Sequence, residues 1–240
     1  RDWINALQIS PSGERFITGD DAGGVIVWDS KSLKPINTWQ VPGVAWISSV
    51  ALSPDGTTAV VSQYRRKGGD HNNYPAGVRI YNVADGALKL DVLAKMFPKE
   101  KNPAYKYQYD YHKFIAHGLV ACAWSPDGKL IALGQGGEEG DGKVHLISAE
   151  TGELVRDVSG HQYGVTDVLF TRDGKYLFTA GRDTTCRIIR VSDGQEVAKI
   201  GQPRGGQFFD WLSAISLSPD EQWLAAADIS GHIQIWHLVA

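Results

Sequence analysis

The side chains that can bind a metal ion are few and loosely placed. His71, Asp110, His112 and His117 stand in two long segments that lack regular strand patterning. Imidazole and carboxylate groups bind Zn²⁺ well, but a zinc site gathers its ligands at short, fixed spacings. These four residues show no such spacing, and most histidines in such segments are solvated. We therefore predict no metal site.

The short motifs of common catalytic chemistry are also missing. The sequence has no Gly-x-Ser-x-Gly elbow, no His-Glu-x-x-His pair and no complete phosphate loop of the form Gly-x-x-x-x-Gly-Lys-Ser/Thr. Residues 134–139 begin like a dinucleotide-binding loop, but the last glycine is replaced and no helix pattern follows. We predict no catalytic residue and no cofactor.

Tryptophan is the chemically notable residue, with eight copies in the chain. Three of them, Trp3, Trp46 and Trp211, each stand seven residues before a recurring turn. Tryptophan is enriched among the residues that anchor protein partners, because it buries a large surface and keeps one polar group. Two interpretations follow: a binding surface, or side chains that fill gaps between neighbouring repeats.

Two segments combine basic and aromatic residues. Residues 64–76 include Arg65 and Arg66, and residues 95–118 include four alternating tyrosines, which are Tyr105, Tyr107, Tyr109 and Tyr111. Such a mixture can hold a phosphate backbone or an anionic sugar by charge and stacking, or the tyrosines can pack onto the fold. Acidic residues at 138, 139 and 141 make the same region dipolar, which suits a protein partner better. We predict that these residues bind a partner.

A recurring turn indicates how these residues are positioned. Five segments follow the pattern Ser-Pro-Asp-Gly more or less closely, at residues 10–13, 53–56, 125–128, 171–174 and 218–221. Proline presets φ for a turn, aspartate bonds its own backbone and glycine accepts positive φ. Alternating apolar segments lie on both sides of each turn, which predicts a hairpin.

A third and often a fourth strand follow each hairpin, as at residues 88–93 and 154–158. Four antiparallel strands per 43 to 47 residues are typical of a propeller blade. We expect an all-β propeller with blades near residues 1–42, 43–94, 115–160, 161–201 and 208–240, and an insertion at 95–114.

These repeats resemble the WD-repeat family along the whole chain. Trp28 and Asp29 form the pair that gives the family its name, and Gly160-His161 precedes a first strand. The resemblance implies structural roles for Trp28, Asp29 and Trp236, and a hydrogen-bonded set of His161, Thr179 and Asp183 in the fourth blade. The match is degenerate, because Ile189 replaces the tryptophan of that set. The first and fifth repeats have Ala22 and Ser230 where the set has aspartate.

The strands sum to 19, which is four blades and three quarters of a fifth. An unpaired edge strand favours association, and proteins usually cover it. We favour part of a larger, seven-bladed ring belonging to a longer chain, with a five-bladed ring as the alternative.

The unusually long connections all fall on one side of the predicted ring. Strand direction alternates, so loops between second and third strands emerge on the same face as loops between blades. The long segments at 64–76, 95–118, 135–142 and 201–210 are of these two kinds. We call this face the top; the opposite face, the bottom, carries only tight turns.

Charge and cysteine content set the remaining limits. The formal net charge is −3, which argues against a nucleic-acid partner, and no apolar run is long enough to cross a membrane. Cys122 and Cys186 are expected to be buried thiols. We therefore expect a non-catalytic scaffold that binds proteins through its top face. The alternatives are a propeller enzyme that uses the axial cavity, of the lactonase or quinoprotein kind, and a nucleic-acid or glycan binder.

Overall fold

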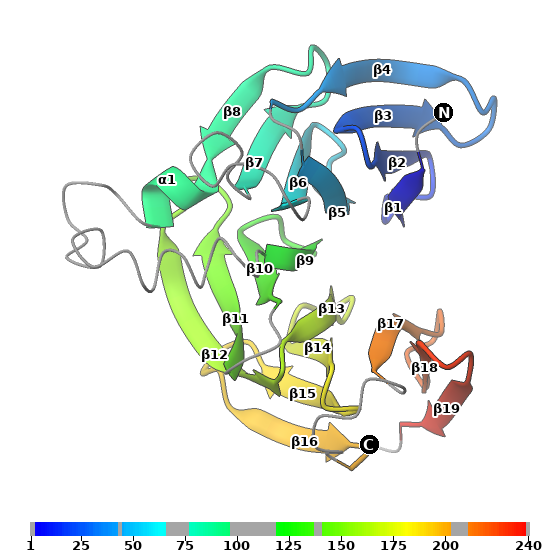
Figure 1. Cartoon of the computed structure of the whole chain (residues 1–240), viewed down its shortest axis with the longest axis vertical. Helices are drawn as coiled ribbons and strands as arrows, with labels where there is room; N and C mark the ends of the chain where they lie inside the picture. The colour runs from blue at the N-terminus through cyan, green and yellow to red at the C-terminus, as the bar shows by residue number, and fades with distance from the viewer. Residues whose placement is uncertain are drawn as a thin grey trace.

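Five antiparallel sheets stand around a common axis in the computed structural model of the chain (Figure 1). The structure describes residues 3–42, 45–65, 77–96, 119–136, 141–202 and 211–238. The predicted all-β propeller is confirmed, and each sheet consists of strands that are consecutive in the chain.

We number the sheets as blades one to five. Blade one contains β1 (Ile4–Ile9), β2 (Arg15–Asp20), β3 (Gly24–Asp29) and β4 (Pro35–Gln40). Blade two contains β5 (Ala45–Leu52), β6 (Thr58–Arg65), β7 (Gly77–Asn82) and β8 (Leu88–Asp91), followed by α1 (Val92–Met96). Blade three contains β9 (Leu119–Trp124), β10 (Leu130–Gln135), β11 (Asp141–Ser148) and β12 (Leu154–Gln162). Blade four contains β13 (Val165–Phe170), β14 (Tyr176–Gly181), β15 (Cys186–Arg190) and β16 (Glu196–Ile200). Blade five contains β17 (Leu212–Leu217), β18 (Trp223–Asp228) and β19 (Ile233–His237).

The recurring turn joins the first two strands of each blade by a fixed set of bonds. In blade three, the Ser125 hydroxyl donates to Asp127 Oδ1 at 2.6 Å and accepts the backbone N–H of Leu130 at 2.9 Å. Gly128 closes the turn with a φ of 71°, a value that glycine adopts without strain. The Ser125 hydroxyl bond lowers the pKa of Asp127, so the carboxylate form stabilises the turn.

The core lies between blades. Ile17 and Val27 of blade one pack with Ile47 and Leu52 of blade two, and all four are at most 1% exposed. Corresponding clusters join blades two and three, three and four, and four and five. In blades two, three and four, one sheet face is buried by the preceding blade and the other by the following one, as stacked blades require.

Two fourth strands differ from the sequence prediction. The strand expected at 88–93 ends at Asp91, and α1 begins at Val92. Val92 is fully buried, and Leu93 and Met96 pack on the same cluster, so one helical turn places all three against blades two and three. In blade three, β12 continues beyond Val158 to Gln162 and pairs with Asp141 and Gly142.

Blade five has three strands, and the five blades form an open arc (Figure 1). Neighbouring blades contact each other along the series β1, β5, β9, β13 and β17, whereas blades one and five make no extended contact within the described residues. The number of sheets fits the five-bladed alternative; the seven-bladed ring stays a prediction. Among the described residues, no helix is long and apolar enough to cross a membrane.

Candidate functional site

The three predicted tryptophans occupy equivalent positions at the top of their blades. The Trp3 carbonyl accepts the N–H of Asp21 at 3.0 Å, and the Trp211 carbonyl accepts that of Ile229 at 2.9 Å. Trp46 pairs with Tyr64 in the same register of blade two. The repeat therefore presents an aromatic side chain at the same place in blades one, two and five.

Their surroundings differ sharply. Trp3 is 77% exposed and Trp46 is 40% exposed. Trp211 is half-buried, and the guanidinium carbon of Arg182 lies 4.5 Å from its ring centroid. A cation over an indole ring is a stabilising contact, so Trp211 links blade four to blade five. Trp211 therefore lies in a contact between two blades, whereas Trp3 and Trp46 are exposed; the partner-binding role of all three stays a prediction.

A charged and amide cluster lies at the top of blade two, on the sheet face opposite to Trp46, because Gln63 pairs with Ile47 whereas Trp46 pairs with Tyr64. Arg79 Nη1 donates to Gln63 Oε1, and Arg79 Nε lies 3.3 Å from Asp91 Oδ2. Gln63 is buried, so these bonds hold the top ends of β6, β7 and β8 together. Gln63 Nε2 also donates to the Pro42 carbonyl at 3.3 Å, so the cluster fixes the top of blade two on the face that packs toward blade one.

The structure does not describe the side chains of the remaining predicted partner-binding residues. Arg65 is the last residue of β6, but its side chain is not described, and Arg66, Tyr105, Tyr107, Tyr109 and Tyr111 fall outside the described residues. The histidine cluster at 71, 112 and 117 falls outside them as well. Within the described residues, no group of three metal-ligating side chains occurs.

The structure brings His161, Thr179 and Asp183 together as one buried network. His161 Nδ1 lies 2.8 Å from Asp183 Oδ1, and His161 Nε2 lies 2.7 Å from the Thr179 hydroxyl. Thr185 Oγ1 donates to Asp183 Oδ1 at 2.8 Å, and Arg187 Nη2 donates to Asp183 Oδ2 at 3.2 Å. Burial favours a higher pKa for Asp183, but His161 and Thr185 outweigh it and lower the pKa to about 2. The network fixes the turn between β14 and β15.

Blades one and five stabilise the same turn with a different aspartate. Asp20 Oδ1 accepts the backbone N–H of Ala22 at 3.0 Å and that of Gly24 at 2.6 Å. In blade five, Asp228 Oδ1 accepts the N–H of His232 at 2.9 Å. Asp20 and Asp228 stand two positions before Ala22 and Ser230, which occupy the position of Asp183.

The two arrangements exclude each other on steric grounds. Gly181 occupies in blade four the position of Asp20 and Asp228, and a Cβ atom there would lie 2.2 Å from Cγ of His161. A blade can therefore hold the histidine or the earlier aspartate, but not both in these positions. The sequence analysis assigned no role to Asp20 and Asp228. A signal was available, because each of the two repeats that lack an aspartate at the position of Asp183 has one two residues earlier.

The other residues given structural roles lie in two blades. In blade one, Trp28 Nε1 donates to Thr18 Oγ1 at 3.0 Å, and the Trp28 ring stacks on Phe16 with centroids 5.7 Å apart. Asp29 accepts the N–H of Ser32 at 2.7 Å and so closes the bottom turn. Trp236 is partly buried against the cluster between blades four and five.

The two cysteines do not form a reactive site. Cys122 and Cys186 are free and buried, and burial raises the pKa of both thiols to about 12. Thiols in this state are inert as nucleophiles.

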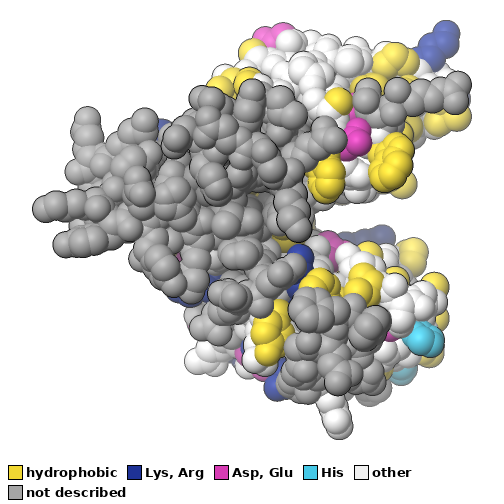
Figure 2. All heavy atoms as spheres, in the orientation of Figure 1, with side chains coloured by type: hydrophobic (Ala, Val, Ile, Leu, Met, Phe, Trp, Pro, Cys, Tyr) yellow, Lys and Arg dark blue, Asp and Glu magenta, His cyan; other side chains and the backbone are white. Residues whose placement is uncertain are grey.

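Blades one and five expose apolar sheet faces. Leu7 and Ile9 of blade one are each 59% exposed, whereas Val50 and Leu52 at the equivalent positions of blade two are 4% and 1% exposed. Ile233 and Ile235 of blade five are exposed as well. Figure 2 shows hydrophobic side chains on both sides of the opening.

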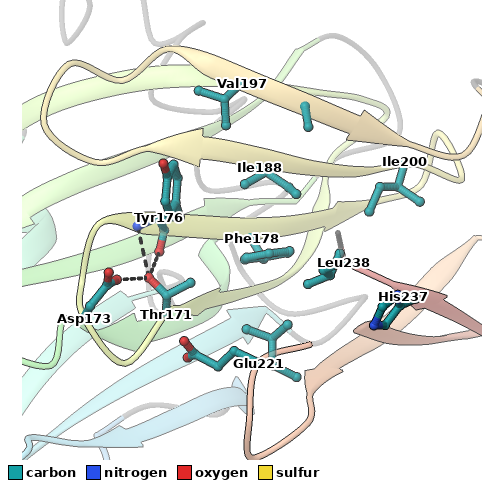
Figure 3. Close-up of a pocket in the computed structure, with 12 residues that line it drawn as sticks. Thr171, Asp173, Tyr176, Phe178, Ile188, Val197, Ile200, Glu221, His237 and Leu238 are labelled. Carbon is teal, nitrogen blue, oxygen red and sulfur yellow. Dashed lines mark hydrogen bonds between the residues drawn. The ribbon is translucent and has the colours of Figure 1, made fainter. Parts of the chain in front are cut away.

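A groove of about 580 Å³ runs between blades four and five near the bottom. Its lining is mainly apolar and includes Phe178, Ile188 and Ile200 of blade four and Leu238 after β19 (Figure 3). The groove lies where a fourth strand of blade five would pack, so it reflects the three-stranded form of that blade.

Comparison with known proteins identifies the repeat. The family model described as WD domain, G-beta repeat matches residues 1–29, 109–148, 152–190 and 206–237, which is more than half of the chain. The match includes Trp28 and Asp29, His161, Thr179 and Asp183, and Trp236.

Individual relatives cover most of the chain at low identity. Eukaryotic translation initiation factor 3 subunit I of Vanderwaltozyma polyspora is 27% identical over 196 residues, which is 81% of this chain and 51% of the relative. Actin-interacting protein 1 of Drosophila melanogaster is 26% identical over 219 residues, covering 82% of this chain and 34% of the relative. The chain thus spans about half the length, or less, of these relatives.

A solved structure has the same fold. The Cps50 (Swd1) β-propeller domain of Myceliophteria thermophila matches with a TM-score of 0.72 at 16% identity, over 98% of this chain and 69% of that domain.

Proposed function

The chain belongs to the WD domain, G-beta repeat family, and from that premise we propose that it is a non-catalytic scaffold that binds protein partners on its top face. Two relatives carry names that state an association: one is a subunit of a translation initiation factor, and the other is an actin-interacting protein.

The exposed indole of Trp46 is the observation that carries the proposal. Trp46 is 40% exposed at the top end of β5. A large exposed aromatic side chain is of the kind found at the centre of interface hot spots, where tryptophan is enriched. Arg65, Arg66 and the four tyrosines at 105–111 are proposed as the rim of the same patch.

The contrast between the two faces supports this placement. At the bottom, each first hairpin closes through the same short turn, as in Ser53 to Thr58 and Ser125 to Leu130. The longer connections start and end at the other ends of the strands, where Ala45 pairs with Arg65 and Gln63 pairs with Gly77. Variable loops on a rigid scaffold are the usual carriers of binding residues.

The test is a comparison of Trp46→Ala with Asp193→Ala. A partner is first isolated by affinity purification from the source organism and identified, and its affinity is then measured by calorimetry. We expect Trp46→Ala and Tyr107→Ala each to weaken binding at least about tenfold with unchanged thermal unfolding. Lysine-to-alanine changes in residues 95–113 should mainly alter the association rate and its salt dependence.

Asp193→Ala is the matched control, because Asp193 accepts the Gln195 N–H in a bottom turn of blade four. It should leave partner affinity unchanged. If Asp193→Ala abolishes binding while both top-face variants retain it, the proposed surface is wrong.

A further inference from the structure

A pocket on the bottom face lies between two complete blades. It has a volume of about 310 Å³ and is lined by the recurring turns of blades two and three, by Trp124 of β9 and by Glu150 after β11. Both blades have four strands and a neighbouring blade on each side. The pocket therefore belongs to the middle of the arc and does not depend on the two end blades.

The size of one repeated side chain accounts for the space in this pocket. The first residue of each second strand donates its N–H to the serine or threonine hydroxyl of the turn before it. In blades one to five this residue is Arg15, Thr58, Leu130, Tyr176 and Trp223. Threonine is the smallest of the five side chains, and Thr58 lines the pocket.

Blade one shows which group fills the corresponding space one blade earlier. Arg15 Nη1 donates to the carbonyl of Gly56, in the turn of blade two, at 3.0 Å. Gly56 and Gly128 occupy the same place in their turns, because each donates its N–H to the carbonyl of the turn serine. Gly128 lines the pocket together with Thr58. The repeat itself thus indicates that a guanidinium group fits between these two turns.

The charge of the pocket favours a cation. Asp55, Asp127 and Glu150 line it, and Lys89 is the cation of the same lining. Lys129 Nζ lies 3.9 Å from Asp127 Oδ2 and is largely exposed. A hydrogen bond from the turn serine hydroxyl holds the pKa of Asp55 and that of Asp127 below the usual range, so both carboxyl groups are charged at neutral pH.

Trp124 gives the pocket an aromatic wall. Its Nε1 donates to the Ala51 carbonyl at 3.2 Å, which holds the indole against blade two. A planar guanidinium stacks on an indole and pairs with carboxylates, whereas an ammonium is a compact, strongly hydrated charge. Asp127 and Glu150 are exposed, so a side chain can enter between them from outside.

We propose that this pocket binds the side chain of an arginine in a partner polypeptide, in the place that Arg15 takes one blade earlier. The guanidinium donates to the Gly128 carbonyl, pairs with the carboxylates of the lining and stacks on the Trp124 indole. Arginine is enriched among the residues that anchor protein interfaces. The pocket is a second binding surface, on the face opposite to the one proposed above.

The probe is the blocked pentapeptide acetyl-Gly-Gly-Arg-Gly-Gly-amide. It is titrated into the whole chain, and binding is followed by NMR of the backbone amides and the indole N–H groups. We expect saturable shifts at the Gly128 amide and the Trp124 indole. Replacing the arginine by citrulline, an uncharged analogue of the same shape, should abolish these shifts. Replacing it by lysine should weaken binding at least about threefold, because an ammonium neither stacks nor forms paired hydrogen bonds.

A protein variant makes the complementary test. Thr58→Arg places an arginine of the chain itself in the pocket, as Arg15 is placed in blade one. We expect it to weaken peptide binding at least about tenfold, because a tethered group competes at a high effective concentration. The matched control is Tyr176→Arg, at the equivalent and partly exposed position of blade four, which should leave the affinity unchanged. Glu150→Gln should weaken binding about twofold to fivefold, as expected for an exposed ion pair.

Five outcomes overturn the proposal. They are no saturable shift at millimolar peptide, equal binding of the citrulline peptide, equal binding of the lysine peptide, full affinity in Thr58→Arg, and shifts of the same signals with protein concentration alone. The last would assign the pocket to an arginine of a second copy. If Thr58→Arg does not fold, the citrulline and lysine peptides still decide the question on the unaltered chain. The top-face function is tested separately by Trp46→Ala.

Discussion

Blades four and five stabilise the same turn in different ways. Blade four uses a buried network in which Asp183 holds His161, Thr185 and Arg187. Blade five uses a single local cap, in which Asp228 accepts N–H groups of its own turn. The network connects β12 of blade three with the β14–β15 turn of blade four, whereas the cap connects the turn only with itself. The comparison shows that the same turn can be stabilised either by contacts that reach the neighbouring blade or by contacts within the turn alone.

The largest expected effect is that of Asp183→Ala. Removing the carboxylate leaves Arg187 without one acceptor and leaves the buried His161 Nδ1 with only the Thr185 hydroxyl, 3.3 Å away, as a hydrogen-bonding contact among the described residues. Breaking a buried ionic network in this way typically costs about 3 to 5 kcal/mol. Urea unfolding followed by tryptophan fluorescence measures the loss. A change below about 1 kcal/mol would mean that the network does not stabilise blade four.

Gly181→Ala should have the next largest effect. The added Cβ would meet the His161 ring, and forced overpacking of this kind costs about 1 to 3 kcal/mol. The double variant Gly181→Asp with His161→Ala transfers the arrangement of blades one and five into blade four. Unfolding measurements should show it to be more stable than Gly181→Asp alone; if it is not, the two arrangements are not alternatives.

Asp20→Ala should cost less, because the Asp20 cap involves two backbone N–H groups of one exposed turn. We expect a loss of about 1 kcal/mol in the same urea titration. The matched control is Asp21→Ala at the neighbouring position, whose carboxylate accepts, among the described residues, the Trp3 N–H alone. A loss from Asp20→Ala as large as that from Asp183→Ala would remove the distinction between cap and network.

A pH titration sharpens the contrast within blade four. The pKa of Asp183 is lowered to about 2, so its stabilisation is present above about pH 4 and is lost as the pH falls toward 2. Burial raises the pKa of Asp167 to about 6, although the hydrogen bonds that its carboxylate accepts from the N–H groups of Ile215 and Val168 lower the pKa. The neutral Asp167 therefore stabilises the fold below about pH 4, and this contribution is lost as the pH rises through 6.

Asp167→Asn, a neutral replacement, tests this difference and has the smallest expected effect. Its melting temperature relative to the wild type should increase between pH 4 and pH 7, because only the wild type becomes charged there. A gap that stays constant with pH would show that Asp167 does not titrate in this range. The hydrogen bond that Asp167 accepts from the N–H of Ile215 would then stabilise the fold equally at every pH in this range.

Short-range signals in the sequence account for most of the fold. The Ser-Pro-Asp-Gly turns predict the first hairpins, because proline, aspartate and glycine each fix a local backbone geometry. The alternation of apolar residues adds the strands, and the equal distance from Trp3, Trp46 and Trp211 to the turn places them at equivalent positions. These features depend on neighbours within a few residues.

Features that depend on contacts between blades were less predictable. The strand expected through Leu93 gives way to α1 because Val92 and Met96 pack on the cluster between blades two and three. Whether a tryptophan is exposed depends on the preceding blade: Arg182 covers Trp211, while no described residue of a preceding blade covers Trp3. The partner-binding roles of Trp3, Trp46 and the loop tyrosines stay predictions.

The nearest-neighbour arrangement of the sheets has a consequence for hydrogen exchange. Each sheet is built from consecutive strands and packs only on the blades beside it, so the chain behaves as a linear array of cooperative units. Opening of such an array starts from its ends, where a unit has one neighbour instead of two. Amide protons of β17–β19 should therefore exchange by separate opening of blade five, and those of blades two and three should exchange last. Blade one, which has four strands but one neighbour, should fall between them.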